Sequence, residues 1–198
     1  MTTTRRIETE HRTRSGGAIT AWVVLGVVSG LGMTYGLAAM HGESIINGTT
    51  TLTPATAVGV AALCYLAAAA TRTRWVAWLG VPVFSGLAFA GLLGVLPWWT
   101  LFVLAAVVLL GVGVLLGAGQ VTAVQAAALL GYFGMAIVAL QLSVQLGLAI
   151  AGVTLAAHAF WDVKHYRSDE VVFGSLAIFC IGLDLTVGAI CVALAIAG

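Results

Sequence analysis

Three side chains that could bind a metal ion or transfer a proton recur at helical spacing near residue 160. His158, Asp162 and His165 are separated by four and then three residues in HAFWDVKH. An α-helix turns about 100° per residue, so this spacing places the three side chains within about 60° of arc. Two imidazoles and a carboxylate are a ligand set for zinc or another divalent metal ion, with a fourth position for water. They could also relay a proton, because histidine titrates near neutral pH.

A structural interpretation of the same residues stays open. The sequence that follows, KHYRSDE, is strongly polar, so Asp162 and His165 could belong to an ordinary solvated turn at the membrane surface. His158 is harder to explain in this way, because it lies about 9 Å of helix rise inside Lys164.

Asp184 is a lone acid near the middle of the last apolar segment. A charged aspartate at that depth costs about 2.5–3.5 kcal/mol on insertion scales. Small residues and cysteines share its helix face, so we expect this face to point into a helix bundle. Asp184 could hold an ion or a proton there, or it could be a neutral structural acid that donates one hydrogen bond to Tyr132, Gln125 or a backbone carbonyl.

The segments that carry His158 and Asp184 are joined by only about seven residues, so we expect antiparallel neighbouring helices. Helix-rise arithmetic puts the two side chains at depths that differ by roughly 10 Å, which is too far for contact and suits a water-linked or substrate-filled path. Gln125 and Tyr132, seven residues apart on another apolar segment, are expected to line the same cavity.

A second candidate site lies between the first two apolar segments, in HGESIINGTTTLTP. His41 and Glu43 are close enough there to share a proton or an ion at the outer surface. A polar outer loop is also expected whatever its function.

The composition requires a membrane. The chain has 198 residues, of which 61% are hydrophobic and 8% charged, whereas soluble domains carry about 25% charged residues. A formal net charge of +1, with eight basic residues divided among separate segments, argues against nucleic acid as a partner. We predict an integral membrane protein in contact with the lipid bilayer of a prokaryotic plasma membrane. Its candidate protein partners are a further copy of the chain or another membrane subunit.

The elements that must position these side chains are transmembrane helices. A crossing needs about 20 apolar residues, and the sequence offers seven such stretches, at residues 18–40, 55–71, 75–95, 98–118, 121–141, 144–163 and 171–197. With a cytoplasmic amino terminus, all eight Lys and Arg residues fall on the inner side, as the positive-inside rule requires. We therefore predict an all-α bundle of seven transmembrane helices at 17–198, with its carboxyl terminus outside, preceded by a polar cytoplasmic arm at 1–16 that is disordered or lies on the membrane surface.

Three functions from different classes fit these observations. The first is a small transporter or channel that moves a proton, cation or small solute past the intramembrane Asp184, with His158 as the inner relay. The second is a membrane-embedded enzyme that acts on a lipid with water activated by a divalent metal ion at His158, Asp162 and His165. The third is a non-catalytic membrane subunit or a lipid-binding scaffold. The residues alone do not decide whether the protein is an enzyme.

Overall fold

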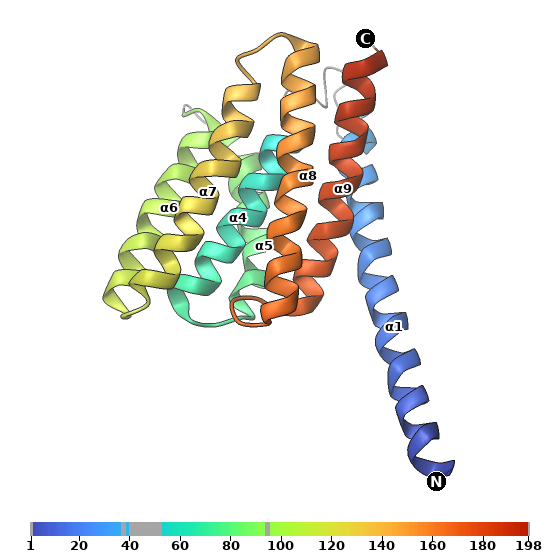
Figure 1. Ribbon diagram of the computed structural model, residues 1–198. Coiled ribbons are helices and arrows are strands. Elements are labelled where there is room, and N and C mark those ends of the chain that lie inside the picture. The colour runs from blue at the N-terminus through green and yellow to red at the C-terminus, as the bar shows by residue number, and fades with distance from the viewer. Residues whose placement is uncertain (1, 37–38, 40–52, 94–95, 198) are drawn as a thin grey trace.

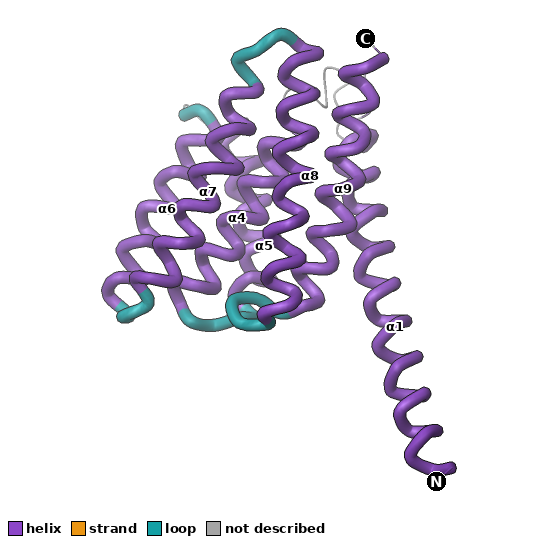
Figure 2. Tube along the Cα trace, in the orientation of Figure 1, coloured by secondary structure: helices purple, strands orange, loops and turns teal. Residues whose placement is uncertain are grey.

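The structure, a computed structural model, describes residues 2–36, 39, 53–93 and 96–197, and every regular element in these ranges is helical (Figures 1 and 2). The prediction of an all-α fold is confirmed. The helices are α1 (Thr2–Leu31), which continues into the short π-helix η1 (Gly32–Gly36), α4 (Thr53–Thr71), α5 (Val76–Leu93), α6 (Trp98–Leu115), α7 (Gly119–Ala139), α8 (Val144–Ser168) and α9 (Gly174–Ala197).

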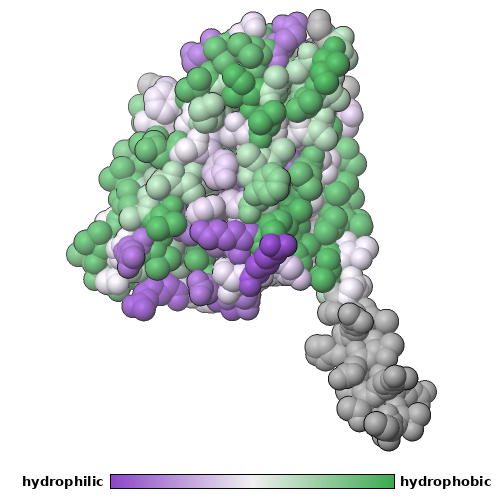
Figure 3. Space-filling model, in the orientation of Figure 1, coloured by the Kyte–Doolittle hydropathy of each residue, from purple (hydrophilic) through white to green (hydrophobic). Residues whose placement is uncertain are grey.

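Six of these helices are long and apolar enough to cross a membrane: α1 from Gly16 onward, α4, α6, α7, α8 and α9. The remaining helix, α5, contributes the shorter apolar segment Val76–Ala90. Figure 3 shows an apolar flank on the face in view, with hydrophilic residues at the two ends of the bundle and the larger group of them at the lower end. An integral membrane protein is therefore what the structure supports, while the orientation in the bilayer stays a prediction.

The amino-terminal arm has a regular backbone from Thr2, while its place in the cytoplasm or on the membrane surface stays a prediction. Its backbone is helical from Thr2 and runs without a break into the apolar part of α1, beyond the end of the bundle (Figure 1). The sequence gives a physical reason, because Glu8 precedes Arg12 by four residues and Glu10 precedes Arg14 by four. Pairs of opposite charge at this spacing each stabilise a helix by about 0.2–0.5 kcal/mol.

Helix α4 is the centre of the bundle. It contacts α5, α6, α7, α8 and α9, and every residue from Ala61 to Ala70 is buried. Alanines make up most of this stretch, AALCYLAAAA, so the surrounding helices approach its backbone closely. The one residue with a polar group on a large side chain in this stretch is Tyr65, which is 1% exposed and lies at the middle of the molecule.

Helices α8 and α9 pack against each other extensively, as their short connection predicts. Two glycines permit the approach: a Cβ added at Gly152 would lie 2.7 Å from the backbone oxygen of Gly188, and one added at Gly188 would lie 2.9 Å from the oxygen of Gly152. The predicted break before α8 is also confirmed, since a turn at residues 140–143 separates it from α7. The close packing of α8 on α9 and the turn before α8 together fix where the polar residues of α8 meet their neighbours.

Candidate metal centre

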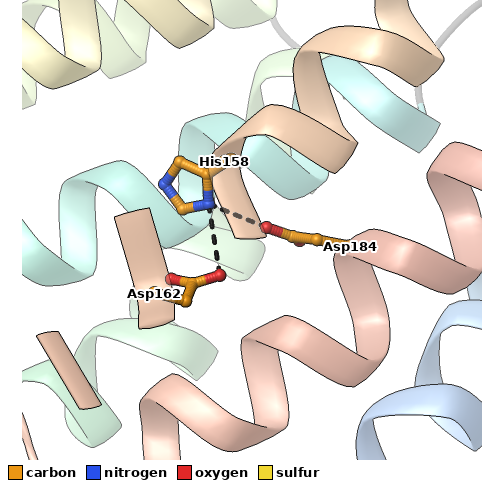
Figure 4. A group of neighbouring side chains, drawn as sticks. All are labelled: His158, Asp162 and Asp184. Atoms are coloured by element: carbon orange, nitrogen blue, oxygen red, sulfur yellow. Dashed lines mark hydrogen bonds and ion pairs between the residues drawn. The ribbon is translucent and has the colours of Figure 1, made fainter. Parts of the chain in front are cut away.

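Two acids and a histidine converge between α8 and α9. His158 and Asp162 come from α8 and Asp184 from α9, and Figure 4 shows both carboxylates beside the same edge of the imidazole. His158 Nδ1 lies 2.7 Å from Asp184 Oδ2 and 3.6 Å from Asp162 Oδ2. All three residues are 0% exposed, and one ligand atom from each lies within 4.8 Å of the other two.

The direct contact of His158 with Asp184 corrects the expected depth difference of about 10 Å. Helix α8 does not end near residue 163 but continues to Ser168, and α9 begins only at Gly174. His158 therefore lies ten residues before the end of α8 and Asp184 ten residues after the start of α9. Both side chains are about 15 Å of helix rise from the connecting turn, which places them at the same level.

The turn that sets this register is fixed by local contacts. Asp169 ends α8 in the left-handed conformation at φ 49°, which aspartate adopts more readily than most residues. Arg74, which precedes α5, forms an ion pair with Asp169 and donates a hydrogen bond of 3.0 Å to the carbonyl oxygen of Val172. These contacts connect the α8–α9 turn to the α4–α5 turn and oppose a sliding movement of α8 along α9.

The charge of the cluster calls for compensation. Among the described residues, the only ion-pair partner of Asp162 and of Asp184 is His158, and no Lys or Arg lies within 4 Å of either carboxylate. Two buried carboxylates with one neutral imidazole carry a charge of −2, and an uncompensated buried charge is strongly unfavourable. Two protons or one divalent cation would neutralise the cluster.

Each member of the cluster also has one buried polar atom without a hydrogen-bond partner in the described part of the chain: His158 Nε2, Asp162 Oδ2 and Asp184 Oδ1. Buried polar atoms are nearly always paired, so three unpaired atoms in one cluster need an explanation. The imidazole nitrogens and carboxylate oxygens gathered here are ligand atoms for zinc, manganese, iron or cobalt. The donor set therefore fits a divalent metal ion.

Tyr65 of α4 supports the centre through Asp162. Its hydroxyl donates a hydrogen bond of 2.7 Å to Asp162 Oδ1, in a fully buried position. A donor to the free oxygen of a ligating carboxylate orients that carboxylate and tunes its affinity for the metal. Sequence reasoning missed Tyr65, which is 97 residues away from Asp162. The available signal was a single phenol inside an alanine run.

His165 does not join the cluster, although the helical spacing placed it beside His158 and Asp162. Gln125 Nε2 donates to His165 Nε2 over 2.9 Å, so the ring proton is on Nδ1, which lies 2.9 Å from the carbonyl oxygen of Trp161. The Trp161 indole in turn donates to Gln125 Oε1 over 3.2 Å. Both imidazole nitrogens of His165 are thus occupied, and Asp184 stands where the sequence suggested a second histidine ligand.

The burial of Asp162 and His165 overturns the idea of a solvated turn. They are 0% and 2% exposed, because α8 extends beyond them and α4 and α7 cover this face. The polar residues that follow them reach the surface, among them Asp169 with a side chain that is 62% exposed.

Tyr132 lies beside the cluster without a strong polar contact to it. Its ring meets the His158 ring edge to face, with centroids 5.0 Å apart and planes at 88°. Its hydroxyl is 3.5 Å from the carbonyl oxygen of Ala157, a long distance for a hydrogen bond. Tyr132 therefore packs against His158, whereas Gln125 belongs to the His165 network. The outer candidates His41 and Glu43 lie outside the described residues.

A cavity of about 430 Å³ adjoins the centre on the α9 side, and Asp184 forms part of its wall. Its other walls come from α1 with η1, α4, α5 and the start of α6, and they are mainly apolar. A molecule that is dissolved in the apolar membrane interior can therefore occupy this cavity next to Asp184, one of the candidate metal ligands.

Comparison with protein-family models, with curated proteins and with solved structures gave no match. Function is therefore inferred from the geometry of the centre itself.

Proposed function

We propose that this protein is a membrane-embedded, metal-dependent enzyme that acts on a lipid, with His158, Asp162 and Asp184 as the ligands of one divalent metal ion. The observation that carries the proposal is the convergence of three buried ligand atoms within 4.8 Å of one another, from two helices in close backbone contact. A divalent cation between His158 Nδ1 and the two Oδ2 atoms would offset the two carboxylate charges and would take up the position that the described side chains leave unpaired on Asp162 Oδ2.

The number of ligands suits catalysis. Catalytic zinc sites have three protein ligands and keep one position for water or substrate, whereas structural zinc sites use four. A metal ion held in this way lowers the pKa of its bound water to about 7 and polarises carbonyl or phosphoryl oxygens. The contribution of the chain is to hold the ligands rigidly. Gly152 and Gly188 bring the two helices together, and Tyr65 orients Asp162.

The substrate class follows from the surroundings of the centre. The cavity that reaches Asp184 is lined mainly by apolar side chains, and a strongly hydrated solute would lose its water on entering it. A lipid loses nothing comparable when it moves from the bilayer into such a cavity. The geometry therefore favours a lipid over a polar substrate.

Transport past Asp184 remains the second candidate, and one observation favours it. Asp184, His158, Asp162 and Tyr65 form a continuous run of polar contacts of 2.7, 3.6 and 2.7 Å from the cavity wall to the central helix. Intramembrane acids and histidines in such a run are typical of ion pathways. A flux of divalent cations into liposomes that contain the purified protein would support this candidate.

The first experiment is elemental analysis of the detergent-purified protein after it has been loaded with zinc or manganese and freed of excess metal. We expect about one metal ion per chain in the wild type, and loss of that ion in His158→Ala and Asp184→Asn. Glu170→Gln is the matched control, because it removes an exposed carboxylate from the turn between the same two helices. Size-exclusion chromatography checks that each variant is folded.

A wild-type protein that stays metal-free after loading would refute the metal centre. If metal binds, incubation with mixed membrane lipids and analysis of the products by mass spectrometry tests the enzyme. Metal-dependent release of a lipid product that His158→Ala does not form is the expected result, and flux without such a product would favour transport.

A further inference from the structure

The cavity beside Asp184 has a composition that suits a single amphiphilic ligand. Its volume of about 430 Å³ lies within the range of about 300–1,000 Å³ typical of small-molecule sites. Apolar and aromatic side chains such as Val60, Phe89 and Leu183 form most of its wall. The hydroxyl residues Ser29 and Ser85 line it as well, from α1 and α5. Such a site accepts an apolar chain together with a small polar head.

Asp184 is the one charged residue among the described residues that line the cavity. This side chain is 0% exposed, and its Oδ2 atom already accepts the contact from His158. Its Oδ1 atom has no hydrogen-bond partner in the described part of the chain. A buried carboxylate oxygen without a donor loses the hydration that it had in water, so a ligand that supplies a donor would be held there.

The wall of the cavity formed by α1 is kept thin by glycine. A Cβ added at Gly32 or at Gly36 would meet no atom within 4 Å, so both glycines border open space. Both belong to η1, a π-helical turn, and such turns are frequent at functional sites. Gly32 is exposed and lines the cavity, so a larger side chain there would stand at the cavity wall without a clash at its Cβ atom.

From these observations we infer that the cavity binds a long-chain lipid with a hydroxyl head, and that the hydroxyl donates a hydrogen bond to Asp184 Oδ1 while the chain lies between α1, α4 and α5. A hydroxyl suits the site better than an ammonium group, because a cation would be repelled by a metal ion bound to the same aspartate. The inference rests on the proposed function and deepens it, because it names the class of lipid that reaches the metal centre.

The test measures binding of radiolabelled hexadecanol to the detergent-purified protein, at known mole fractions in the micelle, with hexadecane and hexadecylamine as competitors. We expect saturable binding of about one molecule per chain. A hydrogen bond to a carboxylate should make hexadecanol at least about tenfold better than hexadecane as a competitor. Hexadecylamine should compete less well than hexadecanol when metal is bound.

Two leucine substitutions separate the cavity from general effects of a larger side chain. Gly32→Leu places the new side chain at the wall of the cavity and should weaken hexadecanol binding at least tenfold, since the leucine narrows the space that the chain needs. Gly86→Leu is the matched control, because Gly86 is exposed on α5, outside the cavity wall, and an added Cβ there meets nothing within 4 Å. Its binding of hexadecanol should equal that of the wild type.

Competition by hexadecane equal to that by hexadecanol would overturn the inference, and so would unchanged binding in Gly32→Leu. Metal content is measured on the same samples, so the two proposals fail separately. Hexadecanol bound specifically to a chain that takes up no metal would remove the metal-dependent enzyme and keep the lipid site. Metal bound to a chain without hydroxyl-selective binding would do the reverse.

Discussion

Replacement of Tyr65 by phenylalanine tests how the centre is supported, because it removes one oxygen atom and keeps the ring. In the wild type that oxygen donates a hydrogen bond of 2.7 Å to Asp162 Oδ1 in a fully buried position. In Tyr65→Phe, both carboxylate oxygens of Asp162 would lack a hydrogen-bond donor, since Oδ2 already has none among the described residues. No other described side chain donates a hydrogen bond to Asp162.

The magnitude follows from two independent estimates. A buried acceptor left without its donor costs about 1–3 kcal/mol. Loss of a partner that orients a metal ligand lowers metal affinity by about 10–100-fold, which corresponds to roughly 1.4–2.7 kcal/mol. We therefore expect Tyr65→Phe to weaken the affinity for zinc or manganese by about 10–100-fold while the folded protein still forms.

The assay is a competition titration with a chelator of known affinity, on protein in detergent. Tyr132→Phe is the control, since it also removes one hydroxyl from a ring that packs on His158, and that hydroxyl makes only a 3.5 Å contact with a backbone oxygen. Its metal affinity should stay close to that of the wild type. Equal affinities for wild type and Tyr65→Phe would refute the reasoning, as would an equal loss in both variants.

Three further predictions concern the scaffold. Gly152→Ala should lower the stability to thermal unfolding in detergent by about 1–3 kcal/mol, because its Cβ would lie 2.7 Å from a backbone oxygen of α9. The control Gly134→Ala, whose Cβ meets no atom within 4 Å, should be neutral or slightly stabilising. Equal melting temperatures of the two variants would contradict the close packing of α8 on α9. His165→Phe should keep about one metal ion per chain in elemental analysis, and loss of the ion would show that His165 is a ligand after all. Asp169→Asn should change the stability by no more than about 1 kcal/mol in the same thermal assay, because its ion pair with Arg74 is partly exposed. A larger loss of stability would mean that this ion pair holds the α8–α9 turn by itself.

The composition of the chain was enough to predict a membrane protein built of helices, since long apolar segments have no other way to satisfy their backbone groups in lipid. The helix positions followed to within a few residues for most segments, including the break at 140–143. The end of α8 was placed too early, because polar residues after Asp162 resemble a surface turn in sequence although they continue the helix to Ser168. That difference, together with the start of α9 at Gly174 instead of residue 171, separated His158 from Asp184 in the predicted arrangement.

The sequence also singled out His158 and Asp184 by their depth in apolar segments, and it named Asp162 as a candidate ligand one helical turn from His158. Helical spacing links only residues of one helix, so it grouped His165 with His158 and could not show that Gln125 binds His165 from α7. The role of Tyr65 could not be predicted from helical spacing for the same reason, because its contact with Asp162 spans 97 residues. Which acid faces the histidine, and which donor faces the acid, depends on how α4, α8 and α9 pack, and that packing is set by small residues whose effect appears only in three dimensions.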